Sequence, residues 1–250
     1  MTTSLQPLRL AIPSDGEMYQ PAQDFLRACG MTVSRASSRR YTATLAWMPN
    51  IVILFQRTGD IPLKVAEGSV DMGITGLDRV RESSWDNENL LVTIDDLGFS
   101  SCELVVAVPE SWIDVTHLSD LADVAVHFKE RGQLIRVGTK YPHLIERFFY
   151  NSGINYFTIA HSSGTIEAAP EMGFADIIGD IISSGNTLRE NGLKTLEDGL
   201  VLSSQACLIT NLDNLKGNNE KLKIARRFLQ IVDASMDSNH YYRVEANLKG

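Results

Sequence analysis

Cysteine, long apolar runs and a surplus of positive charge are scarce or absent in this sequence of 250 residues. The three cysteines, Cys29, Cys102 and Cys207, lie far apart, and none belongs to a Cys-x-x-Cys pair. This argues against a disulfide framework or a zinc site and is typical of a reducing compartment. No window approaches 18 apolar residues, and the N-terminus lacks the basic and apolar segments of a secretory signal. We therefore expect a cytoplasmic protein that is neither exported nor embedded in a membrane.

The formal net charge of -8 argues against nucleic acid and anionic membranes as partners. Proteins that bind such surfaces usually carry a basic face that displaces counterions. With 44% hydrophobic and 22% charged residues, the chain has the composition of a globular protein with one large domain or two lobes. A small anionic substrate remains compatible with this charge, because a few cations and helix N-termini can bind it.

Short apolar runs alternate with amphipathic stretches along most of the chain, which predicts βα units around a mostly parallel sheet. No internal repeat stands out, and the polar stretch 211–220 is the best candidate for a boundary before a C-terminal appendix. We expect strands at 8–13, 50–55, 70–74, 91–94, 102–108, 134–138, 156–160, 176–182, 195–201, 206–210 and 241–246. We expect helices at 21–29, 61–67, 76–82, 142–152, 165–172 and 219–236.

The segment 176–192, DIIGDIISSGNTLRENG, combines an apolar strand, a short polar turn and a helix. Backbone N–H groups and hydroxyls at such a helix start can surround an anion, and glycine permits its close approach. Asp180, just before the turn, could bind the hydroxyls of a ribose whose 5-phosphate lies in the turn. The same residue types also make ordinary turns and helix caps, so the turn alone leaves both interpretations open. The residues concerned are Ser183, Ser184, Gly185, Asn186 and Thr187.

A second small-residue turn, SSGTIEAAP at 162–170, could face the first and contains Glu167. A carboxylate in such a turn is more often solvated than functional. Glu167 is therefore a candidate binding residue only in combination with the first turn.

These motifs resemble, in their order along the chain, the signature of ATP phosphoribosyltransferase, the first enzyme of histidine biosynthesis. The most specific matches are GTIEAAP at 164–170, GFADIIGDIISSGNTL at 173–188 and NGL at 191–193. The resemblance extends roughly over 8–211. Its other matches are IP at 61–62, VAEG at 65–68, DMGITGLD at 71–78, DLGF at 96–99 with Cys102, and GTKYP at 138–142.

The resemblance implies an α/β fold of two lobes, similar to periplasmic solute-binding proteins. Each lobe is expected to have a mixed, mostly parallel sheet flanked by helices, with the active site in the cleft between lobes. Lobe I would comprise 1–99 with a return segment at about 194–212, and lobe II would comprise 100–193. A helix and a strand at 213–250 would resemble the beginning of a regulatory domain without its remainder.

The implied reaction transfers the phosphoribosyl group of phosphoribosyl pyrophosphate (PRPP) to N1 of ATP and releases pyrophosphate. Because an oxocarbenium-like centre forms while a highly charged group departs, the protein must chiefly position reactants and stabilise charge. Magnesium suits this reaction, since it is a hard cation that bridges phosphate oxygens. The family also implies a homo-oligomer and, for its short members, a regulatory subunit related to histidyl-tRNA synthetase.

By the same resemblance, 180–188 would hold the 5-phosphate of PRPP, with Glu167 and Asp180 on the ribose hydroxyls. Arg40 and Arg57 align with arginines of the family and would bind the phosphate groups, so that Arg40, Arg57 and Asp180 form the catalytic set. The remaining candidates for ATP binding, each of which also fits an ordinary turn position, are Asp78, Lys140 and Tyr141.

The sequence departs from the family pattern after its first strand. The family usually has Pro-Lys-Gly-Arg-Leu there, whereas this chain has PSDGEM at 13–18, so Asp15 and Glu17 replace two cations. Three explanations are open: either carboxylate binds magnesium, other arginines compensate, or the substrate differs. The alternative function is a non-catalytic or regulatory paralogue that binds a phosphoribosyl group or another small anionic ligand.

Overall fold

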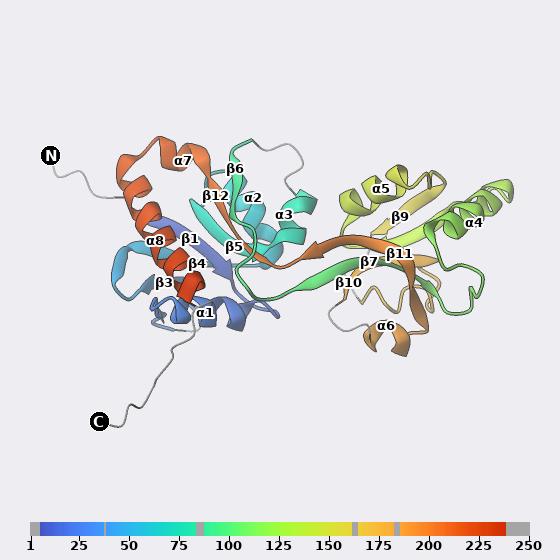
Figure 1. Cartoon of the computed structure of the whole chain (residues 1–250), viewed down its shortest axis with the longest axis horizontal. Helices are drawn as coiled ribbons and strands as arrows, with labels where there is room; N and C mark the ends of the chain where they lie inside the picture. The colour runs from blue at the N-terminus through green and yellow to red at the C-terminus, as the bar shows by residue number, and fades with distance from the viewer. Residues whose placement is uncertain (1–5, 38, 84–87, 162–164, 183–185, 239–250) are drawn as a thin grey trace, which may run out of the picture. The chain divides into compact units, whose positions relative to one another are not determined.

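The computed structural model describes residues 6–37, 39–83, 88–161, 165–182 and 186–238. The chain divides into two compact units, each with its own sheet and flanking helices (Figure 1). Unit 1 comprises 1–79, 83–100 and 206–250, and unit 2 comprises 80–82 and 101–205. The α/β fold with two sheets is therefore confirmed.

Unit 1 contains a seven-stranded sheet in the order β2-β3-β4-β1-β5-β12-β6. The central strand β1 is parallel to β4 and β5, and the other pairs are antiparallel. The strands are β1 (Leu8–Pro13), β2 (Val33–Ser34), β3 (Thr42–Leu45), β4 (Met48–Gln56), β5 (Met72–Gly76), β6 (Leu90–Ile94) and β12 (Ala206–Asn211). The helical segments are α1 (Tyr19–Ala28), η1 (Thr58–Asp60), α2 (Ile61–Ala66), α3 (Leu77–Ser83), which begins in this unit, α7 (Leu212–Lys216) and α8 (Asn219–Ser238).

Helices α1 and α8 bury their apolar stripes in one core with the sheet of unit 1. Leu10 and Ile12 of β1 lie in the same buried cluster as Leu26 of α1 and Phe228 and Val232 of α8. Full burial of a Leu or Phe side chain contributes roughly 1.5–3 kcal/mol, so α8 is a substantial part of this core. The segment expected to be an appendix from residue 213 thus packs into unit 1 as far as Ser238. The strand expected at 241–246 lies outside the described residues.

Unit 2 contains a five-stranded sheet in the order β11-β7-β10-β8-β9. Strand β8 is parallel to β9 and β10, whereas β7 is antiparallel to β10 and β11. The strands are β7 (Cys102–Pro109), β8 (Ile135–Thr139), β9 (Phe157–His161), β10 (Ile177–Ile182) and β11 (Leu193–Ser204). The helices are α4 (Leu118–Glu130), α5 (Pro142–Asn151) and α6 (Asn186–Glu190).

Some expected elements differ from those observed. Residues 165–172 form successive turns rather than a helix, and α4 was not expected. Each sheet has three adjacent parallel strands and otherwise antiparallel pairs, so the sheets are mixed but less parallel than predicted. The return segment expected at 194–212 is shared between the two units. Its β11 part pairs with β7 in unit 2, and the chain rejoins unit 1 only from Ala206.

The two units repeat one structural motif, although no repeat stands out in the sequence. In unit 1 the carboxylate of Asp71, just before β5, accepts the backbone N–H of Arg9 at 2.8 Å and a guanidinium N–H at 3.0 Å. The guanidinium of Arg9 also donates to the carbonyl oxygen of Gly68 at 2.9 Å. In unit 2, Asp176, just before β10, accepts the backbone N–H and the guanidinium of Arg136, both at 2.8 Å.

The repeat includes the turn that precedes each aspartate. The guanidinium of Arg136 donates to the carbonyl oxygen of Gly173 at 2.6 Å, as Arg9 does to Gly68. Both glycines have a left-handed φ, 74° for Gly68 and 73° for Gly173, which favours glycine. We call each arrangement of arginine, aspartate and glycine carbonyl an Arg–Asp clamp. Each clamp joins the starts of two neighbouring parallel strands, β1 with β5 and β8 with β10.

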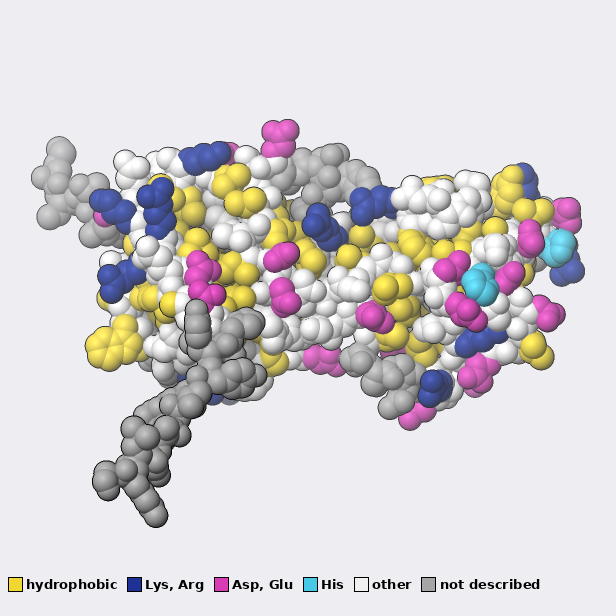
Figure 2. All heavy atoms as spheres, viewed as in Figure 1, with side chains coloured by type: hydrophobic (Ala, Val, Ile, Leu, Met, Phe, Trp, Pro, Cys, Tyr) yellow, Lys and Arg dark blue, Asp and Glu magenta, His cyan; other side chains and the backbone are white. Residues whose placement is uncertain are grey.

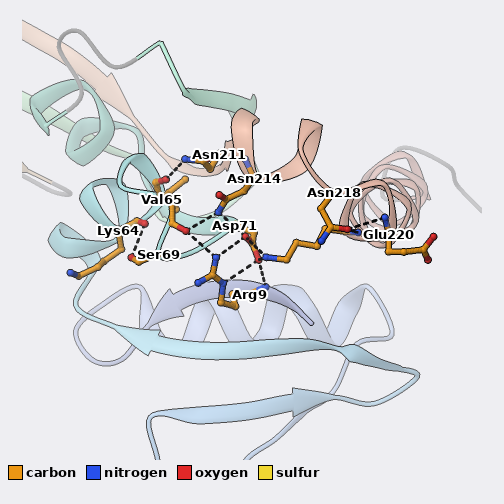
Figure 3. A network of polar contacts seen from close by, with 11 residues as sticks. Arg9, Lys64, Val65, Ser69, Asp71, Asn211, Asn214, Asn218 and Glu220 are labelled. Carbon is orange, nitrogen blue, oxygen red and sulfur yellow. Dashed lines mark hydrogen bonds and ion pairs between the residues drawn. The ribbon is translucent and has the colours of Figure 1, made fainter. Parts of the chain in front are cut away.

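The aspartate of the unit 1 clamp is fully buried beneath α7 and α8, whereas the Arg9 side chain is 35% exposed (Figure 3). Asn214 and Lys221 both donate to Asp71, at 2.8 and 2.9 Å, and the Asp71 side chain is 0% exposed. Burial alone would raise the pKa of Asp71, but the hydrogen bonds from Arg9 and Lys221 hold that pKa below its usual value. The carboxylate therefore stays ionised and attaches α8 to the sheet.

We expect Asp71→Asn to destabilise the protein, because the substitution leaves Lys221 and Arg9 without their anion. Breaking a buried pair by removing one partner destabilises by about 3–5 kcal/mol, and urea unfolding followed by circular dichroism measures it. The lowered pKa of Asp71 means that its contribution is present above about pH 4 and declines as pH falls through the folded-state pKa. The matched control is Lys223→Met, which removes an exposed ion pair with Glu220 and should change stability by less than about 1 kcal/mol. Equal effects of the two substitutions would contradict this role.

We also expect Gly179→Ala to destabilise unit 2. A Cβ atom on Gly179 of β10 would lie 2.7 Å from Cγ1 of Ile145 on α5, so strand and helix would have to separate. Such overpacking destabilises by about 1–3 kcal/mol, measurable as a lower unfolding midpoint. Gly59→Ala is the control, since no atom lies within 4 Å of the position that its Cβ would take and its φ is not left-handed. An unchanged midpoint for Gly179→Ala would show that α5 can move away freely.

Candidate functional site

The carboxyl ends of the parallel strands of unit 1 lie together at one edge of the sheet. Ser14, which follows β1, donates its backbone N–H to the carbonyl oxygen of Gln56 at the end of β4, at 2.7 Å. The hydroxyl of Thr75, in β5, donates to the carbonyl oxygen of Thr58 at 3.0 Å. This edge is where α/β proteins commonly bind ligands. We call it the carboxyl edge of unit 1.

Both predicted arginines lie at the carboxyl edge of unit 1. Arg57 directly follows β4 and is exposed. Arg40 is exposed in the loop before β3, and the next residue, Tyr41, accepts the backbone N–H of Phe55 at 2.9 Å. Because β3 runs antiparallel to β4, this contact places Arg40 near the end of β4. The structure thus brings two exposed guanidinium groups to one edge.

Three predicted carboxylates lie at the same edge. Asp78 is buried in the first turn of α3 and pairs with Arg79 at 3.3 Å. The carboxylate of Asp78 folds back over Gly76, where a Cβ would collide with it. Asp15 and Glu17 are exposed in the turn between β1 and α1. The two acidic residues that stand after the first strand, where the family usually has basic residues, therefore face solvent at the edge that also carries Arg57.

The matching edge of unit 2 lies at the carboxyl ends of β8 and β10, and Asp180 is its most buried carboxylate among the described residues. Asp180 lies on the central strand β10, is 8% exposed, and accepts the backbone N–H of Ile181 at 2.9 Å. Beyond β10, α6 begins at Asn186, and Thr187 is exposed in its first turn. The predicted residues Ser183, Ser184 and Gly185 lie outside the described residues.

Glu167 lies in a turn that packs beside β10 and α6. Its neighbour Ile166 is fully buried in one cluster with Ile178 of β10 and Leu188 of α6. Glu167 itself is partly exposed. The described part of the second turn therefore packs through Ile166 against β10 and α6, the two elements that flank the first turn in the sequence.

The start of α5 differs from the open anion site that the sequence suggested. Lys140 is exposed, but Tyr141 is 1% exposed and packs with Leu104 and Leu144, so its ring belongs to the core. The backbone N–H groups of His143 and Leu144 donate to the carboxylate of Glu82, both at 3.0 Å. Glu82 belongs to unit 2, and its carboxylate therefore already binds the backbone N–H groups at the start of α5.

Sequence inspection missed two buried threonines beside these sites. Thr75 binds the carbonyl of Thr58 through its hydroxyl, and Thr139, at the end of β8, accepts the backbone N–H of Tyr141 at 2.9 Å. Both orient the turns that follow the strands. The sequence did contain a signal for them, because each is a threonine near the end of an apolar run.

Figure 2 shows acidic, basic and hydrophobic side chains intermingled over the face in view. No helix among the described residues is long and apolar enough to cross a membrane. Within the described ranges, no three His, Cys, Asp or Glu side chains gather as metal ligands would.

The chain matches the family model for ATP phosphoribosyltransferase over residues 57–231. It is 39% identical to the ATP phosphoribosyltransferase of Nitrobacter hamburgensis over 246 residues, which cover 98% of this chain and 75% of the relative. It is 42% identical to that of Mesorhizobium japonicum over 207 residues, which cover 82% of this chain and 89% of the relative.

Two solved structures share the fold. The ATP phosphoribosyl transferase (HisG:HisZ) complex from Thermotoga maritima contains a chain with a TM-score of 0.70 at 23% identity, covering 92% of this chain and 99% of that one. The alkanesulfonate-binding protein SsuA from Xanthomonas axonopodis matches with a TM-score of 0.52 at 13% identity, covering 92% of this chain and 73% of that one. The likeness to a solute-binding protein confirms the expected fold class.

Sequence identity over nearly the whole chain, the family model and the shared fold lead to one conclusion. The chain belongs to the ATP phosphoribosyltransferase family, the enzymes of histidine biosynthesis that transfer the phosphoribosyl group of PRPP to N1 of ATP.

Proposed function

We propose that the carboxyl edge of unit 2 binds PRPP and that the carboxyl edge of unit 1 binds ATP and the departing phosphates. The observation that carries this proposal is Asp180, a carboxylate that is 8% exposed on the central strand β10, six residues before the start of α6 in the sequence. Burying a carboxylate is costly unless hydrogen bonds, opposite charges or a ligand compensate it. A ribose supplies adjacent hydroxyls that can donate hydrogen bonds to a carboxylate.

Asp180 would act on the ribose in two ways. Its carboxylate would accept hydrogen bonds from the ribose hydroxyls and so fix the sugar relative to the attacking adenine. Its negative charge would also stabilise the positive charge that develops at C1 of the ribose as pyrophosphate leaves. Glu167, on the turn that packs beside β10 through Ile166, would bind a ribose hydroxyl with it.

The 5-phosphate of PRPP would lie at the start of α6, where Thr187 is exposed. Hydroxyls and backbone N–H groups at a helix start suit a phosphate. The other residues that we propose for this phosphate are Ser183, Ser184, Gly185 and Asn186.

Arg40 and Arg57 would bind the phosphate groups of ATP and the leaving pyrophosphate. A guanidinium group donates several N–H bonds in one plane and keeps its charge at all physiological pH values. The two exposed arginines at one sheet edge therefore suit a highly charged ligand. Asp78, buried beside Arg79, and exposed Lys140 are weaker candidates for nucleotide contact, and the buried ring of Tyr141 favours packing.

Magnesium would enter with the substrates rather than occupy a resident cage. The described residues provide no cluster of three ligands, whereas magnesium binds readily through phosphate oxygens, waters and one or two carboxylates. Asp15 and Glu17, exposed at the edge that carries Arg57, are the carboxylates that could approach such a complex. This would also explain acidic residues beside an anionic ligand.

We further propose that the protein assembles with copies of itself and with a regulatory subunit related to histidyl-tRNA synthetase, in the cytoplasm. The Thermotoga maritima protein was solved as a complex of HisG with HisZ.

The competing function is a paralogue that binds PRPP without turnover. The exposed carboxylates of Asp15 and Glu17 favour it, because they repel ATP unless a cation lies between them and the nucleotide. Purified protein mixed with ATP, PRPP and magnesium separates the two, since only the enzyme produces the absorbance of N1-substituted adenine.

We expect Asp180→Asn and Thr187→Val each to weaken PRPP binding. Losing a hydrogen bond to a charged group costs about 1.5–3 kcal/mol, which corresponds to an increase of roughly ten- to a hundredfold in the PRPP dissociation constant. Isothermal titration with PRPP and magnesium measures this, and ATP affinity should not change. Thr195→Val, an exposed threonine on β11, is the matched control. Unchanged PRPP affinity for Asp180→Asn would refute the assignment of this edge.

We expect Arg57→Gln to raise the KM for ATP and to lower kcat, because the guanidinium would stabilise charge in both the bound and the departing phosphates. A change of roughly tenfold or more in kcat/KM is expected for loss of a charge-assisted hydrogen bond. Arg39→Gln, also an exposed arginine of unit 1, is the control. Equal kinetics for the Arg57 and Arg39 variants would remove Arg57 from the site.

A further inference from the structure

A third arginine, Arg35, contacts the loop that carries Arg40 at the carboxyl edge of unit 1. Its Nε–H donates to the backbone carbonyl oxygen of Arg40 at 2.6 Å. The central carbon of its guanidinium lies 3.9 Å from the ring centroid of Phe55 on β4. Another N–H of the same group donates to the hydroxyl oxygen of Tyr19 on α1 at 3.5 Å. The guanidinium of Arg35 thus joins α1, β4 and the loop before β3.

The two aromatic rings that contact Arg35 are themselves fixed by packing. Phe55 is 1% exposed in the core of unit 1. The centroid of the Tyr19 ring lies 6.2 Å from that of Phe55, and Tyr19 packs against the same core. A guanidinium over the face of an aromatic ring is attracted by the electrons of that face. Arg35 is therefore attached to a rigid part of the unit.

The backbone around Arg40 is fixed on three sides, whereas its side chain is available. Besides the hydrogen bond from Arg35, the N–H of Arg40 donates to the carbonyl oxygen of Ser37 at 3.0 Å. The next carbonyl oxygen, that of Tyr41, accepts the N–H of Phe55 at 2.9 Å. The exposed guanidinium of Arg40 makes no hydrogen bond or ion pair with the described part of the chain. A fixed backbone that presents an available cation suits a ligand contact.

We propose that Arg35 is a positioning residue that orients the guanidinium of Arg40 toward the phosphate groups of ATP. The inference rests on the proposed function of Arg40 and deepens it, because it names the residue that fixes this cation. Phe55, on which Arg35 lies, is followed two residues later by Arg57. Arg35 therefore links the loop that carries Arg40 to the strand that leads into the other proposed phosphate ligand.

The physical reason is the cost of ordering a long side chain on a loop. Arginine loses conformational freedom when it binds a ligand, and a loop that must be ordered at the same time adds to that loss. Small displacements of a binding group also reduce rate strongly. Loss of Arg35 should therefore remove part of the contribution of Arg40, because the hydrogen bond between Tyr41 and Phe55 still holds the loop to β4.

A double-mutant cycle of Arg35→Met and Arg40→Gln tests the proposal. Arg40→Gln should lower kcat/KM for ATP about tenfold or more, as for loss of a charge-assisted hydrogen bond. Arg35→Met should lower it roughly three- to tenfold, with the same division between KM and kcat. The double variant should match Arg40→Gln within about twofold, since Arg35 acts only through Arg40. Isothermal titration with ATP and magnesium follows the same cycle without turnover, and PRPP affinity should not change.

The matched control is Arg39→Met, which removes an exposed guanidinium from the same loop and leaves the contacts of Arg35 in place. This control separates positioning from a general loss of positive charge, and it should leave kcat/KM for ATP within about twofold of the unmodified protein. A far-UV circular dichroism spectrum equal to that of the unmodified protein shows that each variant is folded.

The outcomes distinguish this inference from the proposed function. If Arg40→Gln weakens ATP binding but Arg35→Met does not, only the role of Arg35 is overturned. Additive losses in the double variant, or an equal loss for Arg39→Met, also overturn it. If Arg40→Gln leaves ATP affinity and kinetics unchanged, or the unmodified protein does not bind ATP, the assignment of Arg40 fails and the inference fails with it.

Discussion

The Arg–Asp clamp is the interaction on which each unit of this protein depends. Two parallel strands that are joined through a long crossover have no turn to set their register, unlike a hairpin. Arg9 and Asp71 set it for β1 and β5 by combining backbone and side-chain hydrogen bonds in a single pair. Arg136 and Asp176 do the same for β8 and β10. Both clamps act at the amino ends of the strands.

The candidate binding residues lie at the opposite ends of the same strands. Asp180 is four residues beyond Asp176 on β10, and Thr75 is four residues beyond Asp71 on β5. Each clamp fixes the alignment of two strands at their amino ends. This alignment therefore also determines where the candidate binding side chains lie at the carboxyl ends. This separation lets the carboxyl edges carry exposed charges such as Arg57, while the buried carboxylate of Asp71 lies at the opposite ends of the strands.

Lys221 extends the role of the unit 1 clamp to the C-terminal helix. Its ammonium group is nearly buried against Asp71, and α8 adds Phe228 and Val232 to the core. Unit 2 shows the same clamp without such a cover among its described residues. The contrast between the two units follows from where the chain places α7 and α8, and it leaves Met172 and Phe174 exposed beside Arg136.

The amino-acid sequence by itself determined most strands, the family and the order of the motifs, because apolar periodicity and short signatures such as GDIISSGNTL are local properties. It also predicted that Arg57 directly follows the carboxyl end of a buried strand, as it does after β4. Only the tertiary structure decided that residues 165–172 form turns, that Tyr141 belongs to the core, and that α8 is part of unit 1. It alone revealed the repeated clamp, since Arg9 and Asp71 are 62 residues apart and Arg136 and Asp176 are 40 apart. Burial and pairing of this kind depend on which distant segments pack together, and a local pattern does not contain that information.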